Sequence, residues 1–337
     1  MKQVQIHQVD AFTGIAFGGN PAGVVPDARG LTDDEMQKIA REMALSETAF
    51  VVPGERPRQF VVRFFTPSTE VNLCGHATIG TFFHLAEVGI IGREPGQQVT
   101  RVYQVTKAGE LAVDIFWRPE GGPERVMMEQ NSPERLATYG KPEEIAEIAS
   151  MLGTGPDVIA GVRADATGAA RPGAHPGPNT CACHAIVACH DLVPQVVSTG
   201  LPDLIVPVKS CKALWALKPD LNRVADWSRG HGVISVHAVA LDPVDPAHTG
   251  HCRDFSPAVA VPEEAATGTA SGATAGYLVL NGVVKAEPVA QIVLEQGDIL
   301  KRPSLIHCEI RRERGHERLG VWVGGKAVTV LSGAMRF

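Results

Sequence analysis

Glu47 is the side chain whose setting best suits proton transfer. It stands between Ser46 and Thr48 and directly precedes the apolar run 49–52, so its carboxylate could be partly removed from water. A carboxylate that loses hydration becomes a stronger base, as proton removal from carbon requires. The alternative is a solvated glutamate in a surface turn, which residue type alone favours. Only the surroundings of Glu47 in the fold can separate the two.

Two similar segments supply the next candidates. Cys74-Gly75-His76-Ala77 and Thr267-Gly268-Thr269-Ala270 each open a stretch of helical character. A neutral imidazole at His76 can donate or accept a hydrogen bond, and Thr269 places a hydroxyl at the matching position. The competing interpretation of His76 is a capping or packing histidine. The backbone at these openings is expected to bind substrate through Gly75, Ala77, Gly268 and Ala270.

Acidic residues precede the second opening. Glu263 and Glu264 are adjacent, so at most one of the two carboxylates is expected to face a site. Glu264 is nearer to the Thr267-Gly268 turn and is the candidate, while two solvated loop charges are the alternative. Asn20, in the Gly- and Pro-rich loop 14–21, completes the set of predicted binding residues.

The elements that must position these residues are repeated in the sequence. Phe65-Thr66-Pro67 precedes the first opening and Phe255-Ser256-Pro257 precedes the second. Gly75 lies 14 residues before Gly89, and Gly268 lies 14 residues before Gly282. This agreement predicts two copies of one structural unit. Because N–H groups at a helix N-terminus lack intrahelical partners and carry partial positive charge, two such openings could hold an anion.

Hydrophobic periodicity and turn residues predict an α+β protein of two pseudo-duplicated domains. Thr32 and Glu35 form a capping box at the start of the first helix. The Pro- and Gly-rich segment 118–123 is the predicted boundary, which gives domains 1–120 and 121–337, the C-terminal end being able to pack back on the first. The predicted helices span 33–44, 75–89, 143–152 and 269–280, and the predicted strands span 4–9, 49–52, 60–65, 110–117 and segments near Val196 and Ile205. The loop 161–178 is predicted to be an exposed insertion.

Overall composition argues against several functional classes. A chain of 337 residues with a net charge of −6 and no basic patch offers no footprint for nucleic acid. No apolar stretch approaches the roughly 20 residues that a membrane helix needs. Seven irregularly spaced cysteines and the lack of a signal segment favour a cytoplasmic protein. Cys181, Cys183 and Cys189 have poor spacing for zinc, and no nucleotide-binding fingerprint is present, so neither metal nor cofactor is expected.

Taken together, these segments resemble the PhzF family of phenazine biosynthesis. The resemblance rests on Leu45-Ser46-Glu47-Thr48, Gly19-Asn20-Pro21 and the segments 63–70, 74–78, 263–270 and 296–304, in the family's order along nearly the whole chain. It implies a diaminopimelate-epimerase-like fold, in which each domain is a curled sheet around a central helix and the active site lies in the interdomain cleft. It also implies a cofactor-free enzyme that is commonly a homodimer.

The resemblance also implies residue roles. In the name-giving enzymes a glutamate removes a proton from a ring carbon of trans-2,3-dihydro-3-hydroxyanthranilate and returns one elsewhere, and that glutamate corresponds to Glu47. The supporting residues correspond to His76, Glu264 and Thr269, the last two standing where the family usually has aspartate and serine. The expected function is a cofactor-independent isomerase that shifts a proton within a small carboxylate-bearing substrate.

Two other functions stay open. A two-thiol amino-acid epimerase of the same fold needs a cysteine on each face of its substrate, but Thr267 stands at the position that matches Cys74. A non-catalytic protein could bind a small carboxylate with the two helix openings. A carboxylate facing an anionic ligand would weaken such binding, so Glu47 favours an enzyme.

Overall fold

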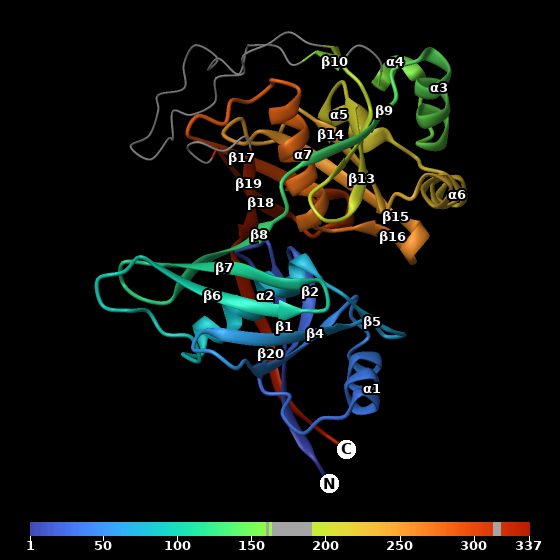
Figure 1. Ribbon diagram of the computed structural model, residues 1–337. Helices are drawn as coiled ribbons and strands as arrows, with labels where there is room; N and C mark the ends of the chain where they lie inside the picture. Colours follow the sequence, from blue (N-terminus) through green and yellow to red (C-terminus); the bar gives the residue numbers. More distant parts are fainter. Residues whose placement is uncertain (160–161, 164–190, 313–317) are drawn as a thin grey trace. The chain divides into compact units, whose positions relative to one another are not determined.

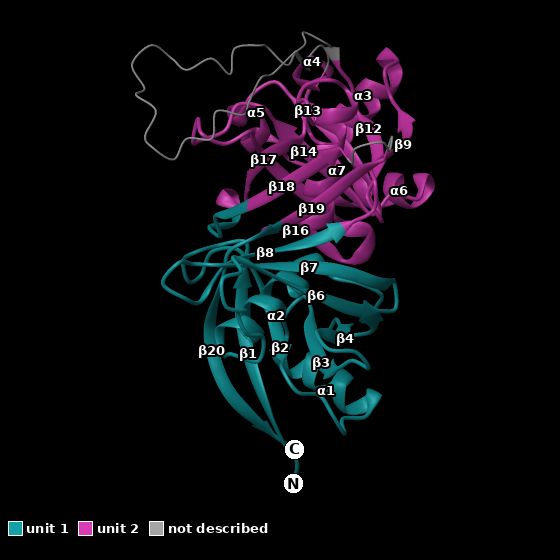
Figure 2. Cartoon of the chain, turned by 60° about the vertical axis from the view of Figure 1, so that its left-hand side comes forward, with its two compact units in different colours: residues 1–129, 300–305, 324–337 teal, residues 130–299, 306–323 magenta. Residues whose placement is uncertain are grey.

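The computed structural model describes residues 1–159, 162–163, 191–312 and 318–337, and the chain forms two compact units (Figure 2). Unit 1 comprises Met1–Glu129, Leu300–Leu305 and Gly324–Phe337. Unit 2 comprises Gln130–Ile299 and Ile306–Val323. The C-terminal strand of the chain therefore folds with the N-terminal one, in the same unit.

Unit 1 is a mixed sheet with one buried helix (Figure 1). Its elements are β1 (Gln3–Ala11), β2 (Asn20–Val25), α1 (Asp33–Met43), β3 (Thr48–Pro53), β4 (Gln59–Phe65), β5 (Glu70–Val71), α2 (Gly75–Glu87), β6 (Val99–Thr106), β7 (Gly109–Trp117), β8 (Pro123–Gln130) and β20 (Ala327–Arg336). β20 pairs antiparallel along the whole of β1. The predicted boundary segment 118–123 leads from β7 into β8, two antiparallel strands of this unit.

Unit 2 also combines strands with one buried helix (Figure 1). Its elements are β9 (Glu134–Thr138), α3 (Pro142–Met151), α4 (Pro156–Ile159), β10 (Val162–Arg163), β11 (Asp191–Leu192), β12 (Gln195–Ser198), β13 (Pro202–Val208), α5 (Cys211–Ala216), α6 (Leu221–His231), β14 (Ser235–Ala240), β15 (Gly250–Ser256), β16 (Val261–Glu264), α7 (Gly268–Leu280) and β17 (Val289–Gln296). Two 3-10 turns, Pro257–Val259 and Asp298–Leu300, and the strands β18 (Ser304–Arg312) and β19 (Leu319–Gly325) complete the described chain.

The predicted duplication is present in the strand pairing. In unit 1, β2 pairs parallel with β3, β3 antiparallel with β4, and β4 parallel with β6. In unit 2, β13 pairs parallel with β14, β14 antiparallel with β15, and β15 parallel with β17. A short strand, β5 or β16, returns along β4 or β15 just before the buried helix. The two units therefore share one strand and helix order.

The two buried helices match residue by residue. α2 is buried from His76 to Ala86, and α7 is buried along most of its length, as expected for helices that are apolar on all sides. α2 packs on β1, β2 and β20, whereas α7 packs on β12, β13 and β14. Each helix is followed by a glycine with positive φ, Gly89 at 80° and Gly282 at 70°. Glycine adopts this conformation without strain, which explains why a glycine follows each helix at the same distance from the helix start.

α1 illustrates how local sequence fixes an element. Thr32 N–H donates to Glu35 Oε2 over 2.8 Å, and Glu35 N–H donates to Thr32 Oγ1 over 3.2 Å, so the predicted capping box is confirmed. Met36, Ile39 and Ala40 then pack with Val4, Ile6 and Phe50 in one apolar core. The helix ends at Met43, and its C-cap residue Ala44 has a left-handed φ of 53° that turns the chain toward Glu47.

Some sequence predictions fall on residues that the structure does not describe. The insertion predicted at 161–178 is described only at Val162–Arg163, and Cys181, Cys183 and Cys189 lie outside the described residues. Among the described helices, none is long and apolar enough to cross a membrane.

Candidate active site

Glu47 lies in the short connection between α1 and β3, and its backbone is hydrogen-bonded to the neighbouring strand β2. Its carbonyl oxygen accepts a hydrogen bond from Gly23 N–H of β2 over 2.9 Å. Gly23 permits this approach because a Cβ there would lie 2.6 Å from Thr48 Oγ1. The side chain of Glu47 is only 16% exposed, and its Oε2 is buried without a hydrogen-bond partner in the described structure. The interpretation as a solvated surface glutamate is therefore wrong.

His76 meets Glu47 from the first turn of α2. Its Nε2 lies 3.2 Å from Glu47 Oε2 and 3.2 Å from Ser46 Oγ. The contact with Oε2 is close but not aligned as a hydrogen bond, so that oxygen keeps a lone pair for another proton. At the other side of the ring, Asn20 Nδ2 lies 3.3 Å from Nδ1. Because an amide nitrogen can only donate, Nδ1 accepts, and the proton of the neutral ring sits on Nε2, where Ser46 Oγ can accept it.

Burial keeps His76 neutral. The imidazole is 4% exposed, and this burial lowers the pKa of His76, while the nearby Glu47 carboxylate acts in the opposite direction. The charged form of a buried histidine is disfavoured because it loses its hydration. Burial is the largest cause of this lowering. A neutral donor therefore stands beside a carboxylate with an unused lone pair.

The loop that carries Asn20 is held by an ion pair between the buried Asp10 and the partly exposed Arg302. Arg302 Nη2 donates to Asp10 Oδ1 over 2.9 Å and to the Gly18 carbonyl over 2.7 Å, and Arg302 Nε donates to the Gly19 carbonyl over 2.8 Å. Asp10 is fully buried, and its other oxygen accepts from Phe17 N–H over 2.9 Å. Arg302 thus fixes the backbone that leads into Asn20.

The N-terminus of α2 has no side-chain cap. Its N-cap residue Cys74 has extended backbone, and its side chain makes no capping hydrogen bond. The Cys74 sulphur instead lies 3.5 Å from His76 Nδ1. The first N–H groups of the helix, which include those of Gly75, His76 and Ala77, have no intrahelical acceptors. They are suited to bind an anion beside Glu47 and His76.

The opening of α7 in unit 2 is also uncapped but is braced differently. Its N-cap Thr267 makes no side-chain capping hydrogen bond. The buried Gln296 instead donates from Nε2 to the Glu264 carbonyl over 3.0 Å and to Thr267 Oγ1 over 3.2 Å, and its Oε1 accepts from Thr267 N–H over 3.2 Å. Glu264 and Thr269 are half-buried on either side of this turn. One amide therefore sets the conformation of the segment between Glu264 and the helix.

A second pair of side chains supports the first turn of α7. Gln130 Nε2 donates to the Gly268 carbonyl over 3.3 Å, and Thr199 Oγ1 donates to Gln130 Oε1 over 2.8 Å. Thr199 Oγ1 also lies 3.4 Å from the Thr269 carbonyl. These contacts anchor the carbonyl side of the turn and leave its N–H groups pointing the other way along the helix axis.

The strand registers show that Glu47 has an equivalent position in unit 2. Thr48 pairs with Phe65 in unit 1, and Val236 pairs with Phe255 in unit 2. Since Phe65 and Phe255 begin the two matching turns, the residue that corresponds to Glu47 is Ser235. Ser235 is buried and donates to Asp203 Oδ1 over 2.9 Å. Only the first unit has a carboxylate at this place.

The predicted residues therefore fall into two groups. Asn20, Glu47 and His76 are brought together in unit 1, next to Gly75 and Ala77. The other group lies in unit 2 and consists of Glu264, Gly268, Thr269 and Ala270. Sequence reasoning missed the contacts of Ser46, Gln296 and Arg302. The signal for all three was present, because each is a polar residue within a segment that resembles the PhzF family.

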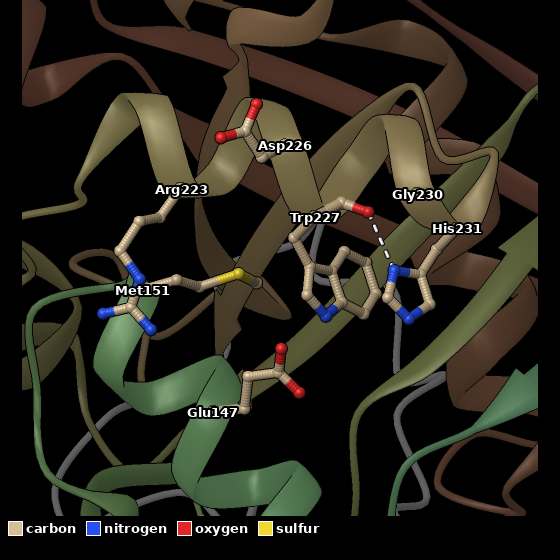
Figure 3. Close-up of a pocket in the computed structure, with 7 residues that line it drawn as sticks. All are labelled: Glu147, Met151, Arg223, Asp226, Trp227, Gly230 and His231. Atoms are coloured by element: carbon tan, nitrogen blue, oxygen red, sulfur yellow. Dashed lines mark hydrogen bonds between the residues drawn. The ribbon is translucent and has the colours of Figure 1, made fainter.

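A separate pocket lies between α3 and α6 of unit 2 (Figure 3). Trp227 and His231 stack there with ring centroids 3.9 Å apart, and Glu147, Met151 and Arg223 are among the other lining residues. His231 Nδ1 lies 2.8 Å from the Trp227 carbonyl, so this nitrogen makes its hydrogen bond within α6. None of the predicted site residues lines this pocket. It is not the candidate active site.

Comparison with known proteins identifies the family. The PhzC-PhzF model, described as phenazine biosynthesis-like protein, matches residues 9–171 and 174–333. The chain belongs to this family. An uncharacterized isomerase of Clostridium acetobutylicum is 30% identical over 333 residues, which cover 98% of this chain and 97% of the relative. A Bacillus anthracis phenazine biosynthesis protein of the PhzF family is 27% identical, with a TM-score of 0.80 over 100% of both chains.

Membership of the PhzC-PhzF family agrees with the fold and defines the class of enzyme. A hydroxyproline epimerase from Agrobacterium vitis shares the fold, with a TM-score of 0.60 at 12% identity over 99% of this chain and 91% of the epimerase. The predicted α+β fold with two pseudo-duplicated domains is confirmed. The family and its relatives support classification of the chain as an isomerase. The roles predicted for individual residues stay predictions.

Proposed function

We propose that the chain is a cofactor-independent isomerase in which Glu47 moves a proton between two positions of one small, carboxylate-bearing substrate. The observation that carries this proposal is the buried Glu47 Oε2, which has no hydrogen-bond partner in the described structure and lies 3.2 Å from the Nε2 of a buried neutral histidine. An unused, poorly hydrated carboxylate oxygen is the group that proton removal from carbon requires.

The proposed reaction conserves every atom of the substrate. Glu47 takes the proton from an acidic C–H bond, and the electron pair of that bond passes into the adjoining conjugated system. The protonated Glu47 then returns the proton at a second carbon, so the carboxylate is regenerated. His76, neutral and with its proton on Nε2, stabilises the carboxylate without forming a competing positive charge. Asn20 maintains this tautomer from the other ring nitrogen.

The substrate carboxylate is proposed to bind at the N-terminus of α2. Its N-cap side chain leaves the first N–H groups uncapped, and they lie on the same turn as His76. Glu264 and Thr269 are proposed to handle a second proton and a substrate oxygen, roles that rest on the family resemblance. The uncapped opening of α7 and its bracing by Gln296 are compatible with these roles.

Two-thiol epimerisation is the weaker candidate. The A. vitis hydroxyproline epimerase shares the fold, but its 12% identity carries no argument about residues. In this chain the N-cap of α2 is Cys74, whereas the N-cap of α7 is Thr267, which holds the Gln296 amide. Inversion at carbon needs a base on one face and an acid on the other, and only one of these equivalent positions has a thiol. Proton transfer by Glu47 avoids that difficulty.

The proposed function predicts exchange of substrate hydrogen with solvent. The purified chain would be incubated in deuterium oxide with dihydroaromatic and cyclic amino-acid carboxylates, and with the carboxamide of each as a matched control. Mass spectrometry and NMR would locate the incorporated deuterium. We expect exchange at one carbon of a carboxylate substrate and much slower exchange with its carboxamide, since a neutral group gains little from the helix N-terminus. Equal exchange rates for a carboxylate and its carboxamide would contradict the proposed binding mode.

The resemblance also leads us to propose a homodimer. Light scattering coupled to size-exclusion chromatography would give the mass in solution, for comparison with the 35.8 kDa of one chain. A mass of one chain at micromolar concentration would contradict the dimer but leave the proposed chemistry intact.

A further inference from the structure

Three metal-binding side-chain types converge at the proposed base. Glu47, Cys74 and His76 each offer one ligand atom, and these atoms all lie within 4.8 Å of one another. They come from two short segments of unit 1, the connection before β3 and the first turn of α2. Cys74 and His76 are both less than a tenth exposed, and Glu47 is 16% exposed on its side chain. The set is therefore enclosed and not a scatter of surface groups.

The distances between the donor atoms suit a small tetrahedral ion. Ligands around zinc lie about 3.4–3.6 Å apart, if Zn–N and Zn–O are about 2.0–2.2 Å and Zn–S is about 2.3 Å in a tetrahedron. His76 Nε2 lies 3.2 Å from Glu47 Oε2 and 3.9 Å from Cys74 Sγ. Small rotations of the side chains would bring the three atoms to one ion. Water would supply the fourth ligand, as in zinc sites with three protein ligands.

Charge also favours a divalent cation here. A carboxylate and a thiolate together neutralise a divalent ion, and the neutral imidazole adds no charge. The positive end of the α2 dipole opposes a bare cation, but it stabilises the Cys74 thiolate that would bind it. Oε2 of Glu47 is buried without a hydrogen-bond partner in the described chain, and a metal ion would give that oxygen a partner.

The ligand types select the metal. A thiolate with an imidazole and one carboxylate suits Zn²⁺ and Co²⁺, whereas Mg²⁺ and Ca²⁺ prefer oxygen ligands alone. Metal binding at His76 Nε2 would move the ring proton to Nδ1, next to Asn20. After rotation of its amide, Asn20 would accept that proton with Oδ1, the arrangement that orients most metal-bound histidines.

We propose that Glu47, Cys74 and His76 form a site for a thiophilic divalent cation such as Zn²⁺, and that an ion bound there blocks proton transfer. The binding site stands on the geometry alone. The inhibition rests on the proposed function, because the ion would occupy the lone pair with which Glu47 removes the proton. The site is thus a reversible inhibitory site and not a requirement for the reaction.

Cobalt binding would test the site directly. Because Cys181, Cys183 and Cys189 could also bind metal, the full-length chain would carry serine at these three positions, and Co²⁺ would be titrated into the metal-stripped protein. We expect one Co²⁺ per chain, with sulphur-to-cobalt charge-transfer absorption, displacement by Zn²⁺ and no competition by Mg²⁺. Cobalt bound without the sulphur band would overturn the proposal.

Variants in the same background would assign the ligands. Cys74→Ser should remove the sulphur band and weaken Co²⁺ binding by at least about 100-fold, since loss of an outer-shell partner alone costs about 10–100-fold. Asn20→Ala should fall within that 10–100-fold range. Cys211→Ser, in another buried thiol, is the matched control and should leave the spectrum and affinity unchanged. Serine is a preferred N-cap residue, so Cys74→Ser should fold, which its thermal unfolding would verify. Equal affinity of Cys74→Ser and Cys211→Ser would overturn the assignment.

Solvent exchange would then test the inhibition separately. Zn²⁺ at a concentration that saturates the site should abolish deuterium incorporation, and a chelator should restore it. If the metal-free chain catalyses exchange but shows no binding that depends on Cys74, the metal site is refuted and the proposed function survives. If the metal binds as expected but the metal-free chain catalyses no exchange with any carboxylate tested, the proposed function fails and the site remains.

Discussion

Removal of Arg302 should disturb both the stability of unit 1 and its candidate site. Arg302→Ala deletes the hydrogen bonds to Asp10, Gly18 and Gly19, over 2.9, 2.7 and 2.8 Å. It leaves the fully buried Asp10 carboxylate with only the Phe17 N–H among its described hydrogen-bond donors. Breaking a buried pair from one side costs about 3–5 kcal/mol, because the remaining charge stays buried. We expect the free energy of unfolding to fall by about that amount.

The matched control is a similar pair at the surface. Arg29 Nη2 lies 2.6 Å from Asp27 Oδ2, and the two side chains are 68% and 51% exposed. Arg29→Ala should leave the free energy of unfolding almost unchanged, because water solvates both partners. Urea denaturation would compare the two variants with the unaltered chain. A shift in the denaturation midpoint reports a change in stability as long as the slope of the free energy against urea concentration stays similar.

Two further readouts would isolate the cause. The double variant Asp10→Asn with Arg302→Ala should be more stable than Arg302→Ala alone, since it removes the uncompensated charge. Arg302→Ala should also slow solvent exchange by about 100-fold, the cost of displacing a catalytic group by about 1 Å. The reasoning would be refuted if Arg302→Ala were no more destabilising than Arg29→Ala, or if the double variant were the least stable of all.

Three other outcomes are expected. Gln296→Leu removes the hydrogen bonds that the Gln296 amide makes to the Glu264 carbonyl and the Thr267 N–H. At about 1–3 kcal/mol for each of these two groups, the free energy of unfolding measured in urea should fall by about 2–6 kcal/mol. A fall of less than about 0.5 kcal/mol would argue against the bracing role. Cys74→Ser should slow metal-free solvent exchange less than about tenfold, whereas loss of an essential general base costs about 10²–10⁴-fold, so the larger loss would restore the thiol mechanism. Burial lowers the pKa of His84 from 6.5 to about 4, and the positive charge of His7 acts in the same direction. Between these two pH values the unfolded chain binds more protons than the folded chain does. The free energy of unfolding should therefore decrease as the pH falls from about 6.5 to about 4. His84→Gln should flatten that decrease in urea midpoints measured at each pH, and an unchanged slope would contradict it.

Local signals in the sequence were sufficient for much of the fold. The Thr32 and Glu35 capping box needs only residues three apart, and Gly89 and Gly282 mark helix ends through backbone conformation alone. The matching helix openings predicted the duplication because each copy must bury the same central helix. Contacts between distant segments left no such signal. Arg302 meets Asp10 across 292 residues, for example.

The candidate site shows the same division. Residue type and neighbours singled out Glu47 and His76, but their 3.2 Å approach depends on how β3 and α2 pack. The equivalence of Glu47 and Ser235 became visible only through strand register, because the two segments share no sequence pattern. Gln296 was part of a recognised segment, yet its role comes from a turn 29 residues away. Side-chain contacts of this kind require the folded backbone.

Deuterium incorporation by Glu47→Gln is the most direct test of the proposed chemistry. Glutamine keeps the size of the side chain but cannot accept the proton, whereas Glu42→Gln changes an exposed carboxylate on α1 and serves as the control. With a carboxylate substrate that the unaltered chain labels, we expect Glu47→Gln to lose about 10²–10⁴-fold or more in exchange rate, and Glu42→Gln to match the unaltered chain. Equal exchange by Glu47→Gln and Glu42→Gln would remove Glu47 from the mechanism.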